Sequence, residues 1–230
     1  MNIRGFCLII FLILTASCFA NLEMKVDSGV SMPWSGFLEV SDSERTQLLM
    51  KNDFRAYFLP TVGYEISGEH LIELSFFHFT VKSTFEATDT DPLASYESMF
   101  KQDVLSLTYM YILPELDRFS LQLGVQGRLW FKQLTLTGSK TFDRKVSDLS
   151  FGPAADLRLQ MNDKVFIGLD VSTGLGKGNG FIDMFAGLHF EGPFYYVRAG
   201  TRYWSVTNSF DNDRFFLSFV NLGVQFCAVF

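Results

Sequence analysis

Hydrophobic and polar positions alternate with a period of two along most of the chain after residue 20. In residues 119–131 the odd positions are apolar or glycine, whereas the even positions include polar side chains such as Gln122 and Arg128. The same alternation returns in residues 149–160 and 195–204. A period of two is typical of β-strands that face an apolar environment on one side and a polar one on the other. The pattern therefore predicts an all-β protein.

Ten strands are predicted, and the alternation is weakest in the first three. They span residues 22–33, 54–66, 71–82, 103–113, 119–132, 148–160, 165–174, 181–190, 194–205 and 214–230. An eight-stranded arrangement is the alternative. Because no repeat, linker or low-complexity tract interrupts the series, residues 21–230 are expected to form a single domain.

The predicted connections alternate in length along the chain. Long connections cover residues 34–53, 83–102 and 133–147, whereas the intervening ones are turns of a few residues. Tight turns at one end and long loops at the other are typical of bacterial outer-membrane barrels. A sheet that spans lipid has to close on itself, and an even strand number brings both termini to the same side. We therefore expect a closed antiparallel transmembrane β-barrel with periplasmic termini.

Both ends of the chain fit export to an outer membrane. Residues 1–20 carry one arginine, an apolar run and small residues before a cleavage position after Ala20, as a signal peptide does. The last strand alternates up to an aromatic residue at the carboxyl end and resembles the assembly signal of bacterial outer-membrane β-barrel proteins, with Phe226 and Phe230 on its apolar face. This resemblance implies a location in the bacterial cell outer membrane, with membrane lipid and the barrel assembly machinery as partners.

Cys18 offers an alternative to cleavage after Ala20. It follows Leu14–Ser17, which resembles the lipobox of bacterial lipoproteins, although Thr15 stands where that pattern usually has an aliphatic residue. With either form of processing, Cys227 would have no cysteine partner in the mature domain, so no disulfide is expected there.

Residues 59–64 are similar to a strand of OmpW-like barrels. Those proteins usually show two adjacent prolines and eight strands, whereas Pro60 stands alone here and ten strands are predicted. The subfamily is therefore not identified by this segment.

Composition narrows the function classes. The chain is 48% hydrophobic and 16% aromatic, which excludes a disordered or collagen-like chain. Its 25 acidic residues outnumber 19 basic ones, giving a formal charge of -6. Nucleic acid is not an expected partner, because phosphate polyanions are bound by surplus Lys and Arg.

If the apolar faces contact lipid, the lumen receives a ladder of mixed charge. Its members are Arg128, Asp156, Arg158, Asp170, Asp183, His189, Arg198 and Arg202. The ladder is either a path or binding site for a small solute, as in a narrow porin-like transport channel, or an ion-paired filling that closes a small barrel. Filling is favoured, because barrels of about eight strands are just wide enough for side chains to fill. Mixed charge also argues against strong ion selectivity.

The predicted turns set specific pairs across neighbouring strands. A turn at residues 191–194 would place Asp183 opposite Arg202, and His189 opposite Tyr196. A three-residue turn centred on Asp163 would likewise bring Arg158 within a diagonal of Asp170. Three rings, those of Trp130, Tyr196 and Trp204, are also expected to take up lumen volume.

Catalytic and cofactor motifs are nearly absent. The three histidines lie far apart in the sequence without a ligand spacing, so neither a metal site nor a cofactor is expected. His189 with Asp183 and Arg198 could form a hydrolytic group, since hydrolysis needs a base oriented by a carboxylate. A paired lumen histidine is more often structural, and an enzyme is therefore not the favoured interpretation.

A second function class places activity on the loops. Residues 34–53, 83–102 and 133–147 would expose a large surface, as in a surface-exposed adhesin or a structural membrane protein. Residues 83–92 carry three acids and no base, which disfavours polyanionic partners.

Overall fold

The computed structural model describes residues 21–39, 46–47, 55–66, 68–86, 95–114, 116–137, 142–210 and 213–230. Within them the strands are β1 (Leu22–Glu39), β2 (Thr46–Gln47), β3 (Arg55–Ile66), β4 (His70–Glu86), β5 (Ser95–Ile112), β6 (Phe119–Thr137), β7 (Phe142–Asn162), β8 (Val165–Gly176), β9 (Asn179–Glu191), β10 (Tyr195–Phe210) and β11 (Asp213–Val229). No helix in these segments is long and apolar enough to cross a bilayer.

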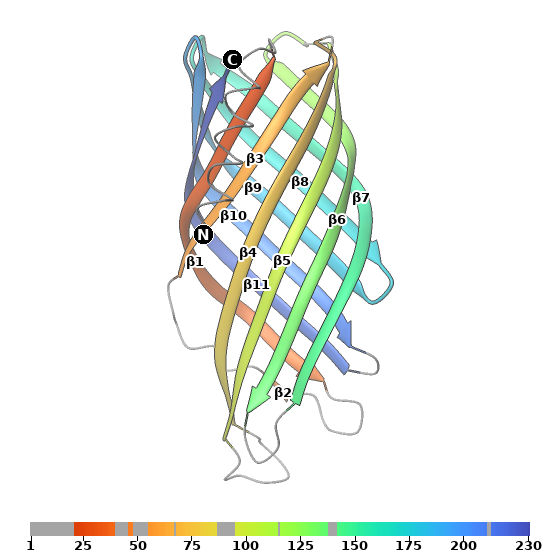
Figure 1. The fold of residues 1–230 in the computed structure, drawn as a ribbon. Coiled ribbons are helices and arrows are strands. Elements are labelled where there is room, and N and C mark those ends of the chain that lie inside the picture. Colours follow the sequence, from red (N-terminus) through yellow and green to blue (C-terminus); the bar gives the residue numbers. More distant parts are fainter. Residues whose placement is uncertain are drawn as a thin grey trace, which may run out of the picture.

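The ten long strands close into an antiparallel barrel. Each pairs with its neighbours along the chain, β1 pairs with β3, and β11 returns to pair with β1 from Glu23 with Val229 onward. The two-residue β2 adds only a short pairing to β1. Closure gives every long strand a hydrogen-bonded partner on both sides, which a sheet in lipid requires. The predicted fold class is therefore confirmed (Figure 1).

The two ends of the barrel differ, as the loop alternation predicts. At one end, called the turn end, Asn21 lies beside Phe230, with its backbone N–H donating to the Phe230 carbonyl at 2.9 Å. The turns after β3, β5, β7 and β9 lie at this same end, at the top of Figure 1. The opposite end is called the loop end. A periplasmic position for the turn end stays a prediction, and the predicted signal peptide and Cys18 lie outside the described residues.

The strands are longer at the loop end than the sequence predicts. β6 continues to Thr137 and β7 begins at Phe142, so most of the predicted loop 133–147 is strand. The predicted loop 83–102 also shortens, because β4 ends at Glu86 and β5 begins at Ser95. Figure 1 shows β4 to β7 reaching furthest at this end. These parts of the predicted loops therefore extend the strands beyond the apolar belt, and a function of the loops stays a prediction.

An apolar belt surrounds the outside of the barrel. On β6 it runs from Phe119 to Phe131 along the odd positions, and Leu123, near its middle, keeps 47% of its surface exposed. Twelve residues of strand tilted by about 40° rise by roughly 30 Å, which matches the hydrocarbon thickness of a bilayer. Exposed tyrosines, Tyr64, Tyr109 and Tyr195 among them, lie toward the turn end of the belt, where amphipathic rings suit a membrane interface.

A row of glycines crosses five neighbouring strands on the lumen side. The paired members are Gly29, Gly223, Gly200, Gly187 and Gly168. A Cβ at Gly200 would lie 2.2 Å from the Ala186 carbonyl oxygen, and one at Gly187 would lie 2.4 Å from that of Ala199. A side chain at either position would therefore clash with the backbone of the neighbouring strand. Glycines at such positions let a sheet bend sharply, which is how a sheet is curved into a small barrel.

Candidate functional site in the barrel lumen

Side chains fill the lumen in three layers stacked from the loop end to the turn end. An apolar aromatic plug lies toward the loop end, a hydrogen-bonded ionic network lies in the middle, and a second set of ion pairs lies toward the turn end. A cavity separates the plug from the turn-end pairs and is bordered by the central network.

The aromatic plug is a contiguous cluster from six strands. Its fully or nearly buried members are Phe79, Phe100, Val104, Trp130, Leu134, Phe181, Trp204, Val206, Leu217 and Phe219. Trp204 is central, with ring centroids 5.5 Å from Phe79 and 5.6 Å from Phe219. Small residues on the other strands make room for these rings. A Cβ at Gly174 would lie 2.5 Å from the Phe181 ring, for example.

The plug is anchored to polar neighbours on the side of the central network, where Ser150 pairs with Arg128. The Trp130 indole N–H donates to Ser150 Oγ at 2.7 Å, which satisfies the polar edge of a fully buried ring. On the side of the central network, the Arg128 guanidinium lies 3.9 Å from the centroid of the Phe181 ring. Such a cation–π contact favours a guanidinium in this desolvated position.

The central network is organised around Asp183. Its carboxylate accepts from Arg128 Nη2 at 2.7 Å and from Arg202 Nε and Nη2, each at 2.7 Å. Arg202 also donates through Nη1 to Asp27 at 2.9 Å, and the Tyr57 hydroxyl donates to the other oxygen of Asp27 at 2.7 Å. The network therefore joins strands that lie at opposite ends of the chain.

The same network continues through Arg128 to the far wall. Arg128 Nε donates to Gln126 Oε1 at 2.7 Å, and Gln126 in turn donates to Thr108 Oγ1 at 2.8 Å. Arg128 Nη2 also reaches Ser172 Oγ at 3.1 Å. Charge-assisted bonds of this kind are the strong ones, and a network spanning the lumen fixes the barrel cross-section.

The turn-end layer contains a further set of ion pairs. Lys25 Nζ lies 2.8 Å from Glu23 and 2.5 Å from Glu73. Arg158 makes two hydrogen bonds of 3.2 Å to Asp156 on its own strand. A further pair joins Arg198 and Asp170, and Arg198 also donates to Gln225 at 3.2 Å.

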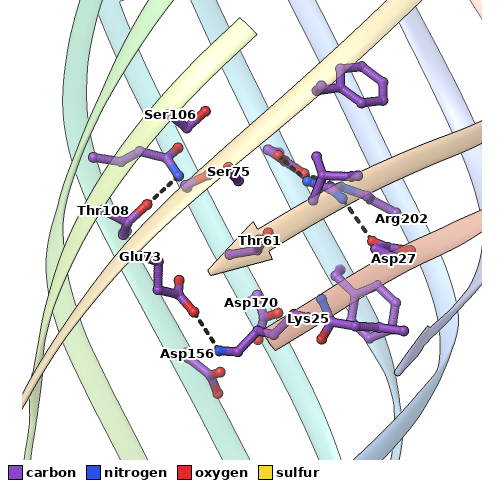
Figure 2. Close-up of a pocket in the computed structure, with 18 of the residues that line it drawn as sticks. Lys25, Asp27, Thr61, Glu73, Ser75, Ser106, Thr108, Asp156, Asp170 and Arg202 are labelled. Atoms are coloured by element: carbon purple, nitrogen blue, oxygen red, sulfur yellow. Dashed lines mark hydrogen bonds and ion pairs between the residues drawn. The ribbon is translucent and has the colours of Figure 1, made fainter. Parts of the chain in front are cut away.

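The cavity has a volume of about 160 Å³, and polar and charged side chains line it together with apolar ones such as Leu59, Phe77 and Val104 (Figure 2). Lys25, Glu73, Asp156 and Asp170 lie on its turn-end side, and Arg202 and Asp27 border it from the central network. Three lining groups keep an atom without a hydrogen-bond partner among the described residues, namely Asp170 Oδ1, Arg198 Nε and Asn221 Oδ1. A polar cavity of this size is large enough to hold several waters or one small polar molecule.

The charge ladder predicted from the sequence does face the lumen. Arg128, Asp156, Asp170, Asp183, Arg198 and Arg202 all line the cavity. Arg158 and His189 lie beyond it in the turn-end layer, where Arg158 is 5.7 Å from the Tyr196 ring centroid. The three predicted lumen rings are also buried: Trp130, Tyr196 and Trp204.

The pairing predicted between β9 and β10 is wrong by two residues. Gly192 and Tyr195 close a turn whose two central residues are Pro193 and Phe194, one position later than predicted. Asp183 therefore pairs with Trp204, and His189 pairs with Arg198. A shift of two preserves the face, so Arg202 still reaches Asp183 diagonally.

The register predicted between β7 and β8 is confirmed. Arg158 pairs with Gly168 and lies diagonal to Asp170, although the hydrogen bonds of Arg158 go to Asp156.

The hydrolytic group considered for His189 does not form. Asp183 is bound by two arginines, and six residues of strand place it about 20 Å from His189. The His189 ring is fully buried, stacks on Tyr196 and packs against Gly168, and neither of its nitrogens has a hydrogen-bond partner among the described residues. Within the part of the chain that the structure describes, no carboxylate orients this imidazole as a general base.

Several lumen groups are absent from the predicted ladder. Lys25, Asp27, Tyr57 and Glu73 come from β1, β3 and β4, where the alternation was weakest. A signal was nevertheless present, since Glu23, Lys25 and Asp27 alternate with apolar residues.

The predicted assembly residues lie at the seam where the barrel closes. Phe226 is half exposed on the outside and stacks on Tyr195, with ring centroids 6.3 Å apart. Phe230 donates its backbone N–H to the Leu22 carbonyl at 3.0 Å. Their role as an assembly signal stays a prediction.

Comparison with known proteins shows the fold. No protein-family model and no curated protein matches the sequence. Among solved structures, the outer-membrane protease OmpT from Escherichia coli matches with a TM-score of 0.57 and 8% identity, over 91% of this chain and 97% of OmpT. Ail, the attachment invasion locus protein of Yersinia pestis, matches with a TM-score of 0.39 and 10% identity, over 89% of this chain and 99% of Ail.

The likeness to OmpT covers the whole barrel and is a likeness of fold alone. The apolar belt adds an independent physical argument, because a closed barrel with an oily exterior and an ionic lumen has the inside-out polarity of a membrane-spanning barrel. The chain therefore has the fold of bacterial outer-membrane β-barrel proteins, together with the exterior that such a barrel presents to lipid.

Proposed function

We propose that this protein is a narrow, gated barrel that binds and passes a small polar solute. The observation that carries the proposal is the cavity of about 160 Å³ in the middle of the lumen, with Asp170 Oδ1 and Arg198 Nε unpartnered beside it. A lumen that served only as filling would be expected to satisfy its buried polar atoms internally.

The lining suggests the class of solute. Donors and acceptors lie side by side, so a small molecule that both donates and accepts hydrogen bonds would complete the unpartnered groups. The charged lining residues are of both signs: Lys25, Arg128, Arg198, Arg202, Asp27, Glu73, Asp156, Asp170 and Asp183. Such a lining does not select strongly between cations and anions.

The aromatic plug supplies the gate in this proposal. It lies on the loop-end side of the cavity, and hydrophobic constrictions close pores by excluding water. Passage would require the Trp204 and Phe219 rings to move apart, so the resting barrel should conduct ions poorly.

Current through planar lipid bilayers in potassium chloride tests the proposal. The wild-type protein should give small or rare openings, whereas the double variant Trp204→Ala/Phe219→Ala should raise the single-channel current several-fold, because it removes two neighbouring rings of the plug. Phe185→Ala is the matched control. It removes a ring from the cavity wall, outside the plug, and should leave the current near the wild-type value.

Each result bears on the gate. A plug variant that folds, as shown by its resistance to protease and its heat-dependent gel mobility, yet stays as silent as the wild type would refute a solute path through this lumen. Equal increases in the plug variant and in Phe185→Ala would show that the plug is not the barrier.

A further inference from the structure

On strands β4 to β7 the outer surface changes from apolar to polar over two rows. A row is here the set of outward residues that are paired side by side across these four strands. Reading across the four strands, the last fully apolar row is Phe76, Leu105, Leu129 and Leu149, and the next is His78, Asp103, Phe131 and Ser147. The row after that is Thr80, Lys101, Gln133 and Lys145. This last set is called the lysine row. It lies toward the loop end, one mixed row beyond the last fully apolar row of the belt.

The lysine row exposes two cations around one neutral residue. Lys101 on β5 and Lys145 on β7 are both exposed and flank Gln133 on β6. Two strand spacings separate their Cα atoms, which is about 10 Å. Long, flexible lysine side chains can converge across such a distance on one anionic group held above Gln133.

The carboxylates on this surface are already engaged. Asp103 lies 2.5 Å from His78 Nδ1. Asp143 accepts from Gln133 Nε2 at 3.0 Å and from Thr135 Oγ1 at 3.3 Å. Among the described residues, no ion pair joins Lys101 or Lys145 to a carboxylate. The two ammonium groups are therefore not committed to an ion pair within the described segments, on a chain whose net charge is negative.

We propose that the lysine row is a binding site for the phosphate headgroup of a membrane lipid in the leaflet at the loop end. Acyl chains would lie along the apolar belt at Phe76, Leu105 and Leu149, and the headgroup phosphate would reach Lys101 and Lys145. The continuity of the row with the belt selects a lipid over a soluble anion, because only a lipid contacts both surfaces at once. Basic side chains at this depth are attracted to anionic headgroups.

Native mass spectrometry of the folded protein in detergent micelles tests the site. The probes are dimyristoyl phosphatidic acid and dimyristoylglycerol, which share acyl chains and differ in the phosphate. Phosphatidic acid should bind at least tenfold more tightly than dimyristoylglycerol. The variant Lys101→Gln/Lys145→Gln should weaken phosphatidic acid binding by about 30-fold, at roughly 1 kcal/mol for each lysine.

The control variant is Lys164→Gln/Lys177→Gln, which removes two exposed lysines elsewhere on the barrel and should retain tight binding. Exposed substitutions of this kind leave folding nearly unchanged. Equal binding of the two probes, or equal losses in the two double variants, would overturn the proposal. Full competition by inorganic phosphate at the concentration of the lipid would also overturn it, because the site would then recognise a free anion.

Discussion

Replacing Asp183 with alanine is expected to lower the free energy of unfolding by about 3–5 kcal/mol, the cost of removing one partner from a buried ion pair. Asp183 receives three hydrogen bonds of 2.7 Å, one from Arg128 and two from Arg202. Its loss leaves two guanidinium groups of like charge in the lumen, and Asp27 remains to neutralise only Arg202. Urea unfolding in detergent micelles, followed by tryptophan fluorescence, measures the difference.

The matched control for this substitution is Asp163→Ala. Asp163 is exposed in the turn after β7, where a substitution is expected to change stability by less than about 0.5 kcal/mol. If Asp183→Ala were as stable as Asp163→Ala, the lumen would tolerate unpaired charge, and the central network would not hold the barrel together.

Replacing Leu123 with arginine is expected to destabilise the membrane-inserted barrel by about 2–4 kcal/mol, the cost of a basic side chain at the mid-plane of a bilayer. Leu123 lies on the outer face of β6 with 47% of its surface exposed, near the middle of the apolar belt. The measurement is reversible unfolding in phospholipid vesicles, because micelles do not reproduce the depth of a bilayer.

The control lies on the same face of the same strand. Thr135 is beyond the belt, so Thr135→Arg should cost about 0–1 kcal/mol, as at a membrane interface. Equal costs for the two substitutions would show that the belt does not mark the depth of the bilayer.

Strand number and facing could be predicted because the two faces of each strand meet different solvents inside the membrane. The alternation in residues 119–131 follows from this difference and correctly places Gln122 and Arg128 in the lumen. Beyond the belt the outer face becomes polar, as at Gln133 and Thr135, whereas the lumen face carries plug residues such as Leu134, so the alternation reverses instead of continuing. Residues 133–137 and 142–147 were therefore predicted as loop, although they continue strands β6 and β7.

The register of strand pairing could be predicted only where the position of the turn was predicted correctly. The turn centred on Asp163 gave the correct pairing, whereas the turn containing Pro193 and Phe194 was placed one residue too early. An error of one turn position shifts pairing by two residues, which keeps every side chain on its face. The contact between Arg202 and Asp183 therefore survived, although the predicted partner of Asp183 did not.

The central network and the plug depend on closure of the barrel, which leaves no local trace in a sequence. Arg202 and Asp27 are 175 residues apart and meet only because β11 pairs with β1. In the same way, Phe79 meets Trp204 and Phe219 through the stagger of the closed strands. The sequence places Arg202 and Trp204 on the lumen face, but it does not identify Asp27, Phe79 or Phe219 as their partners.

The membrane-spanning barrel itself is tested most directly by spin-label scanning of residues 120–131 in β6, in a Cys227→Ala background reconstituted in phospholipid vesicles. Labels at odd positions should be accessible to oxygen dissolved in the bilayer, whereas labels at even positions should be shielded in the lumen from oxygen. This gives accessibility a period of two across the whole segment. Uniform accessibility, or collision with a water-soluble nickel chelate at every odd position, would contradict a β6 strand that crosses the membrane with one face in lipid.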